Sequence, residues 1–175
     1  MRERISNVCA PPARPRGKTV TKVNFERVLP FEATKLFEMV GDVEKYPDYI
    51  PWITSMRVFN RTTVSEGVTR FDAEAGVGFK FLSERFSTRV TRNEAARTID
   101  IHLLKGPFKT LICQWKFEDA DWLGKPGGCC ASLVMDFEFK NPFLTGFLKA
   151  NFDKAVAKLM ACFEGRAETL YPKAV

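Results

Sequence analysis

The residue types that most often carry catalysis are sparse in this chain, and their spacing assembles no familiar site. His102 is the only histidine, so it cannot by itself build the usual zinc site or a Ser-His-Asp triad. The five cysteines show no spacing typical of metal ligands; they are Cys9, Cys113, Cys129, Cys130 and Cys162. We therefore predict neither a metal site nor a catalytic nucleophile.

Acid–base catalysis inside a cavity would need an inward-facing acid or base with a shifted pKa. Asp72 and Glu74 fall on the outward positions of a predicted strand, and His102 alternates with the apolar Ile101 and Leu103. The sequence thus favours a non-enzymatic protein without a catalytic cofactor.

Arg85 and Arg89 lie at alternate positions of one predicted strand and are candidate partners for a polar headgroup. The alternative is a surface ladder of salt bridges with Glu84 or Asp72, which is the more common role of such residues.

Aromatic residues are the unusual feature of the composition. The chain has sixteen phenylalanines, and the segment "GDVEKYPDYIPW", residues 41–52, holds two prolines, two tyrosines and a tryptophan in twelve positions. These numbers predict either a very aromatic core or a cavity for a greasy molecule.

The positive charge is concentrated at the N-terminus. The whole chain has a net charge of +6, and residues 1–22 alone contribute +5. Because residues 1–18 combine prolines with basic groups and few large apolar side chains, we predict a disordered basic tail followed by one domain over residues 19–170. A mitochondrial transit peptide, a plain solvated tail, and a tail that meets anionic lipid or RNA remain alternatives for this tail.

Hydrophobic periodicity outlines the elements. Residues 19–29 alternate as a first strand, residues 31–40 have a helical pattern after Pro30, and a second short helix over 43–46 is expected to end at Pro47. Residues 52–140 read as six strands, and Asn141-Pro142 opens a long helix to about residue 168, with a stripe that includes Leu159 and Phe163.

This order predicts an α+β fold of the helix-grip type. About seven mostly antiparallel strands form one curved sheet that wraps around the long C-terminal helix, and the two short helices after the first strand close one end.

Three segments resemble the coenzyme Q-binding family of START-like domains: "LFEMVGDVEKYPDYIPWI", "LLKGPFKTLICQWKF" and "MDFEFKNPFL". The resemblance runs from about residue 19 to 170. That family is part of a larger group with polyketide cyclases, lipid-transfer proteins and the ribosome-association toxin RatA.

The resemblance implies a hydrophobic tunnel that binds ubiquinone or a related polyprenyl quinone, and a non-catalytic carrier that supports respiratory electron transport. The alternative is a RatA-type protein that binds the large ribosomal subunit and inhibits translation. It also implies a bacterial cytoplasmic location with peripheral contact at the inner membrane, or else the matrix side of the mitochondrial inner membrane. No DNA partner is expected.

In a helix-grip fold, the mouth of the tunnel would lie at Tyr49 and Trp52, with Phe108 on the opposing lip. We expect the tunnel walls to be large apolar side chains from the sheet and the long helix, although each is also a candidate for ordinary core: Phe71, Phe79, Phe81, Leu103, Trp115, Phe117, Met135, Phe137, Phe147, Phe152, Val156 and Met160. Trp52 could equally plug the end of the barrel.

Overall fold

One curved antiparallel sheet and a long helix dominate the fold. The computed structural model describes residues 21–79 and 82–173. Its strands are β1 (Thr21–Leu29), β2 (Ile53–Ser65), β3 (Val68–Phe79), β4 (Leu82–Asn93), β5 (Thr98–Lys105), β6 (Phe108–Trp122) and β7 (Lys125–Phe139). They form a seven-stranded sheet in the order β1-β7-β6-β5-β4-β3-β2, and every neighbouring pair is antiparallel. The predicted helix-grip fold is confirmed.

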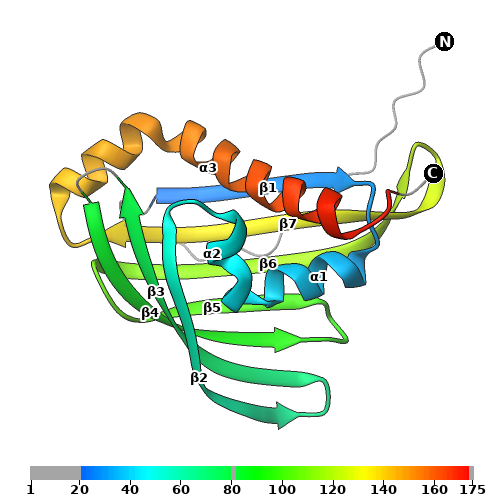
Figure 1. Ribbon diagram of the computed structural model, residues 1–175, viewed down its shortest axis with the longest axis horizontal. Coiled ribbons are helices and arrows are strands. Elements are labelled where there is room, and N and C mark those ends of the chain that lie inside the picture. The colour runs from blue at the N-terminus through cyan, green and yellow to red at the C-terminus, as the bar shows by residue number, and fades with distance from the viewer. Residues whose placement is uncertain (1–20, 80–81, 174–175) are drawn as a thin grey trace.

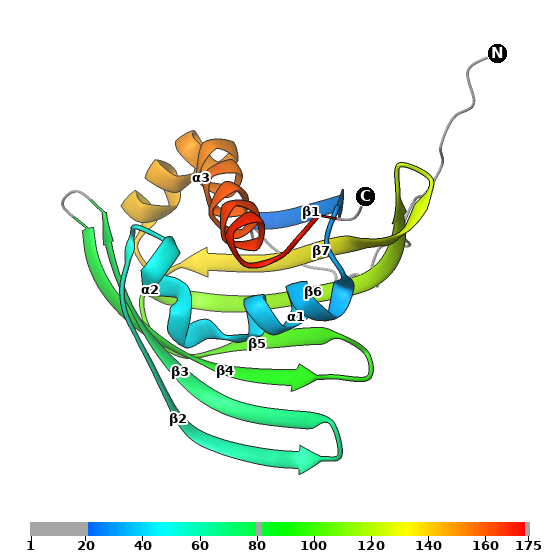
Figure 2. The same ribbon diagram turned by 45° about the vertical axis from the view of Figure 1, so that its right-hand side comes forward.

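Strand β1 pairs with β7, and the whole sheet curves around the helices. Figures 1 and 2 show that the sheet bends strongly and that α1, α2 and α3 all lie on the same side of it. Twist accumulates across antiparallel strands, so a seven-stranded sheet has one concave face that must be covered. The helices supply that cover.

The segment between β1 and β2 contains α1 (Ala33–Gly41), a single 3₁₀ turn (Val43–Lys45) and α2 (Tyr46–Tyr49). The prediction that Pro47 ends a helix was wrong, because Pro47 stands in the first turn of α2. A proline is tolerated there because its missing N–H would have no intrahelical partner. Tyr46 keeps helical backbone angles, and its carbonyl accepts from the Ile50 N–H at 2.8 Å.

Helix α3 (Pro142–Leu170) begins where the sequence predicts and runs slightly further. The Asn141 side chain accepts a hydrogen bond from the Phe143 N–H at 2.9 Å, and Pro142 occupies the first turn. Both features satisfy or remove backbone donors that would otherwise be unpaired at the helix start.

The core fills the space between the sheet and the helices. Its largest fully buried members come from α1, from the α2 end and from the inward positions of the strands, namely Leu36, Phe37, Ile50, Phe71, Val90, Ile99, Phe117, Cys129 and Leu133. Phe37 meets Phe117 edge-on with ring centroids 6.3 Å apart. The predicted tail, residues 1–18, lies outside the described residues. Within the described residues, no helix is both long and apolar enough to cross a membrane.

Candidate functional site

An apolar cavity of about 320 Å³ lies between the concave face of the sheet, α2 and α3. Residues from every strand except β1 line it, together with residues from the 3₁₀ turn, α2 and α3 and from the segment that joins α2 to β2. None of these lining residues carries a charge. They are Val43, Tyr46, Ile50, Trp52, Ile53, Met56, Ala73, Ala75, Val77, Phe86, Thr88, Val90, Ile101, Phe108, Leu111, Cys113, Trp115, Leu133, Met135, Phe137, Phe139, Leu159 and Phe163.

Small side chains on β3 leave this space open. Ala73 and Ala75 point inward at alternate positions, with only 4% of each residue exposed. Because side chains alternate across a strand, these two alanines face the same cavity that Trp115 and Phe163 border from other elements. Larger residues at the two positions would fill the cavity.

An aromatic cluster forms the wall near α2 and α3. The Phe163 ring lies edge-on to Tyr46 and to Trp115, with centroids 5.4 Å apart in both cases. The Tyr46 hydroxyl donates to the Val40 carbonyl at 2.6 Å. Burial raises the pKa of Tyr46 well above its usual value, so the phenol stays neutral and its polar atom is already satisfied.

A second aromatic cluster surrounds Phe108 at the hairpin between β5 and β6. Its ring lies 5.4 Å from that of Phe86 and stacks on Phe139 at 4.6 Å. Gly106 allows the hairpin backbone to lie directly against Phe86. Its φ is +150°, and a Cβ there would lie 2.4 Å from the Phe86 Cβ.

Five of the residues predicted from sequence line the cavity: Trp52, Phe108, Trp115, Met135 and Phe137. The structure thus brings together the predicted lip residues Trp52 and Phe108 with part of the predicted sheet wall. With no ligand bound, their role in binding stays a prediction.

Other predicted residues lie elsewhere. Phe71 and Phe117 are core residues only 1% exposed, and Leu103 packs against the core without lining the cavity. Tyr49 lines a separate polar pocket, although its ring lies edge-on to that of Tyr46 with centroids 5.9 Å apart. Phe81 lies outside the described residues, and the structure describes no side chain for Phe79, Phe147 and Phe152.

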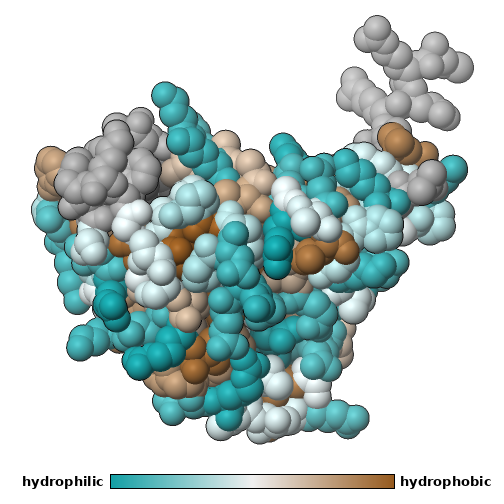
Figure 3. Space-filling model, viewed as in Figure 1, coloured by the Kyte–Doolittle hydropathy of each residue, from teal (hydrophilic) through white to brown (hydrophobic). Residues whose placement is uncertain are grey.

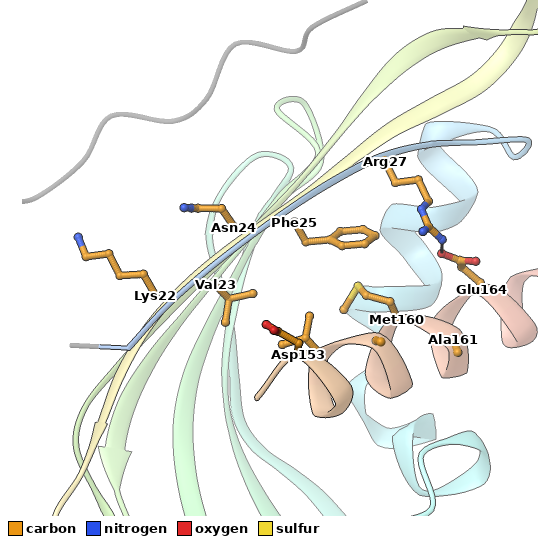
Figure 4. A pocket seen from close by; sticks show the side chains of 11 residues that line it. Lys22, Val23, Asn24, Phe25, Arg27, Asp153, Met160, Ala161 and Glu164 are labelled. Atoms are coloured by element: carbon orange, nitrogen blue, oxygen red, sulfur yellow. Dashed lines mark hydrogen bonds and ion pairs between the residues drawn. The ribbon is translucent and has the colours of Figure 1, made fainter. Parts of the chain in front are cut away.

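Val156 and Met160 face a different space from the one expected. They line a cleft of about 440 Å³ between α3 and β1, which also contains Phe25 and the ion pair between Arg27 and Glu164. Figure 4 shows Met160 and Phe25 on the two sides of this cleft. The turn of α3 that faces the cavity carries Leu159 and Phe163, which belong to the apolar stripe identified in the sequence.

Sequence reasoning missed several lining residues on short segments. Ile50 directly after α2, Ile53 and Met56 from the start of β2, and Phe86 were not singled out. The Ile50 N–H donates to the Tyr46 carbonyl four residues earlier, so the i, i+4 spacing of these two residues was the available signal.

The outer face of the sheet carries the predicted salt-bridge ladder. The Arg89 guanidinium donates to both oxygens of Asp72, at 2.9 and 3.2 Å, and Asn60 donates to one of them at 3.0 Å. These hydrogen bonds hold the pKa of Asp72 below its usual value. Arg85 pairs with Glu74 at 3.5 Å, whereas Glu84 and Asp72 were the partners expected from the sequence. These arginines therefore belong to the sheet exterior, and His102 is also exposed there.

The cavity can hold a ligand, but its lining offers few groups that could catalyse a reaction. Burial raises the pKa of the Cys113 thiol to about 12, so almost no nucleophilic thiolate forms near neutral pH. Across the described part of the chain, no three His, Cys, Asp or Glu side chains gather in a group able to hold a metal ion. The arrangement suits an apolar molecule held by contact.

Comparison with known proteins identifies the family. Residues 29–164 match the family described as polyketide cyclase/dehydrase and lipid transport. The chain belongs to this family. The match covers most of the domain, from the end of β1 through most of α3.

Related proteins within this family carry two kinds of name. The ribosome association toxin RatA of Pseudomonas aeruginosa is 32% identical over 151 residues, which span 86% of this chain and 98% of that protein. The mitochondrial coenzyme Q-binding protein COQ10 homolog B of Xenopus laevis is 27% identical over 151 residues, which span 83% of this chain and 57% of that protein. The resemblance predicted from the three sequence segments is confirmed.

Solved structures show the same fold. An 18 kDa protein from Caulobacter crescentus is 45% identical, with a TM-score of 0.70 over 86% of this chain and 97% of the other. The Zhui aromatase/cyclase from Streptomyces has the same TM-score at 16% identity, over 86% of this chain and 94% of the other, which is a likeness of fold alone.

Proposed function

We propose that the protein binds ubiquinone or a related polyprenyl quinone in the apolar cavity and acts as a non-catalytic carrier that supports respiratory electron transport. The observation that carries this proposal is the cavity itself, which is bounded by sheet, α2 and α3 and has no charge among its described lining residues. Membership of a family that includes lipid transport and similarity to a coenzyme Q-binding protein point to the same class of ligand.

The size of the cavity supports partial enclosure of such a ligand. Its volume of about 320 Å³ is at the lower end of the roughly 300–1,000 Å³ typical of small-molecule sites. A quinone ring with the first part of its tail would fill it, and the remaining tail would extend beyond it. Burial of roughly 300 Å² of apolar ligand surface at about 25 cal/mol per Å² would contribute about 7–8 kcal/mol before ordering costs.

Carriage without catalysis accords with the lining chemistry. Among the described lining residues, Thr88 carries the only hydroxyl besides the already bonded Tyr46, and Cys113 is held as a neutral thiol. A reaction of the aromatase or cyclase kind requires a group that can accept or donate a proton at neutral pH. The part of the lining that the structure describes supplies no carboxylate or imidazole for that task.

Ligand transfer would take place at Trp52 and Phe108. Both rings border the cavity while remaining partly exposed, which suits contact with the interfacial region of a bilayer. The face in Figure 3 is mostly hydrophilic with separate hydrophobic patches. We expect docking to be peripheral, with only these two rings entering the interfacial region.

Mass spectrometry of lipids that co-purify with the native protein tests the proposal directly. A matched pair of variants then places the ligand. Ala75→Phe should fill the cavity and abolish quinone binding, whereas Ala157→Phe, at an exposed position beside the β1–α3 cleft, should retain it. Retained binding in a folded Ala75→Phe protein would exclude this cavity as the site.

A second candidate function is supported by the RatA relative, which matches this chain over nearly its whole length. In this function the protein would bind the large ribosomal subunit. Residues 23–175 have a net charge of only about +1, so such binding would depend mainly on the basic residues before them. Co-sedimentation with ribosomes in sucrose gradients, at low and high salt and with residues 1–17 deleted, separates this function from quinone carriage.

A further inference from the structure

A second pocket, of about 270 Å³, has the opposite chemistry to the apolar cavity. Helix α2 contributes to both, with Tyr46 in the apolar cavity and Tyr49 in this polar pocket. Its walls come from α1, the 3₁₀ turn, α2, β2, β4 and the C-terminal end of α3. The lining residues are Glu38, Met39, Gly41, Asp42, Lys45, Tyr49, Arg61, Arg92, Arg166, Leu170 and Tyr171.

Positive charge exceeds negative charge in this lining by two, since four basic residues face two acidic ones. Two of the guanidinium groups are already paired. Arg92 binds Glu38 with an N–O distance of 2.7 Å, and Arg61 lies 3.8 Å from Glu44 on an exposed surface. The first pair positions Arg92 at the pocket wall, and the second is a weak surface contact.

The remaining basic residues have no counter-ion. Among the residues that the structure describes, neither Lys45 nor Arg166 forms an ion pair. Arg166 instead lies over the Tyr49 ring, 5.4 Å from its centroid. Asp42 is an exposed residue of the lining, and among the described residues it forms no ion pair with either of them.

Two buried donors in the lining also lack partners. The Tyr49 hydroxyl and the Arg92 Nε are inaccessible to solvent and have no hydrogen bond within the described structure. Burial raises the pKa of Tyr49, so its hydroxyl keeps its proton and remains a donor. A Cβ at Gly41 would lie 2.4 Å from Arg92 Nε, so the glycine allows the guanidinium to lie against the end of α1. Buried donors without partners are rare and point to an absent acceptor.

We propose that this pocket binds the phosphate group of a small soluble molecule, either inorganic phosphate or a phosphate monoester. A phosphate dianion matches the excess of two positive charges in the lining. Its tetrahedral oxygens would accept from the Arg92 and Arg166 guanidinium groups, from the Lys45 ammonium and from the Tyr49 hydroxyl, which include both unpaired donors. The Arg166 side chain, stacked on Tyr49, would shift to admit the anion.

Titration of the full chain with inorganic phosphate and with glycerol 3-phosphate, at constant ionic strength, tests the proposal by calorimetry and by thermal shift. Arg166→Gln should weaken binding about tenfold or more, because it removes a charge-assisted hydrogen bond. Lys158→Gln, which removes an exposed charge from the same helix, is the matched control and should bind as the parent chain does.

Tyr49→Phe provides a second readout that separates binding from folding. Because the hydroxyl has no partner among residues 21–79 and 82–173, this variant should melt at the parent temperature or above it in phosphate-free buffer, yet bind phosphate several-fold more weakly. Quinone binding should be unchanged in Arg166→Gln, so failure here and failure of the proposed lipid function can be told apart.

Three results in the binding and variant experiments would each overturn the proposal. They are no saturable phosphate binding at millimolar concentrations, equal weakening by Arg166→Gln and Lys158→Gln, and a Tyr49→Phe variant that binds as tightly as the parent. Flotation with vesicles of phosphatidylcholine with and without phosphatidic acid distinguishes the source of the anion. Binding to phosphatidic acid vesicles without binding to the soluble phosphates would also refute a soluble ligand.

Discussion

Replacement of Phe163 by alanine offers the sharpest test of how α3 is held. Phe163 is only 7% exposed and meets three aromatic rings edge-on, those of Tyr46, Tyr49 and Trp115, at centroid distances of 5.4, 5.7 and 5.4 Å. From α3 it contacts both α2 and the sheet. Truncation therefore removes packing from two layers at once.

The expected loss of stability follows from this geometry. Phe→Ala substitutions in cores cost about 3–5 kcal/mol, and each lost aromatic pair is part of that cost. Phe163 already borders the cavity on one side, so its truncation forfeits fewer contacts than in a solid core. We therefore expect about 3 kcal/mol, which corresponds to a decrease in melting temperature of roughly 6–12 °C for a domain of this size.

Urea and thermal unfolding followed by circular dichroism measure this change. Phe143→Ala is the matched control, because it is the same substitution in the same helix at a side chain that is 65% exposed. Its effect should stay within about 0.5 kcal/mol. Equal effects of the two substitutions, or a loss below about 1 kcal/mol for Phe163→Ala, would refute the packing of α3 described above.

Three further predictions concern the outer face, the cavity mouth and the buried helix stripe. The pKa of Asp72 is lowered by hydrogen bonds from Arg89 and Asn60, so its contribution to stability is present above the unfolded pKa of about 3.9 and is lost as the pH falls through the folded value. Urea midpoints between pH 2 and 7 should therefore depend less on pH in Asp72→Asn than in the parent, and equal slopes would contradict the assignment. Replacement of both Trp52 and Phe108 by alanine should strongly weaken quinone binding, measured by fluorescence quenching, and lower the melting temperature only slightly. Normal binding by a much less stable protein would mean that both residues are ordinary core. Leu159 is partly buried and lines the cavity, so Leu159→Asp should strongly destabilise the fold, because it places a carboxylate without a partner against an apolar lining. A cooperative melt of soluble Leu159→Asp protein at the parent temperature would show that this face of α3 is wrongly assigned.

The arrangement of strands was predictable because its signals are local. Strict alternation of apolar and polar residues defines a strand and both of its faces, and turn residues mark its ends. The cap at Asn141 was equally local, since the side chain bonds a backbone N–H two residues away. The role of Pro47 was misread because proline is compatible with a helix start as well as a helix end, and the Ile50 N–H bond to Tyr46 decides between them.

The candidate site was only partly predictable. Trp52 and Phe108 were found because aromatic residues beside proline or glycine mark rigid loops at the edge of a sheet. Val156 and Met160 were placed on the cavity because they are apolar and lie in α3. Helical periodicity identifies the apolar side of α3, but not which space each residue on that side meets. This side is wide enough that Leu159 faces the cavity while Met160 faces the β1–α3 cleft.

The sequence by itself determined the elements, their order, the two faces of each strand and the family, because these depend on spacing between near neighbours in the chain. The tertiary structure decided which apolar residues are core and which border empty space. Phe71 and Ala73 share one face of β3, yet the first is solid core and the second lines the cavity. The difference arises from what lies opposite each of them across the curved sheet, and no spacing along the chain records the shape of that gap.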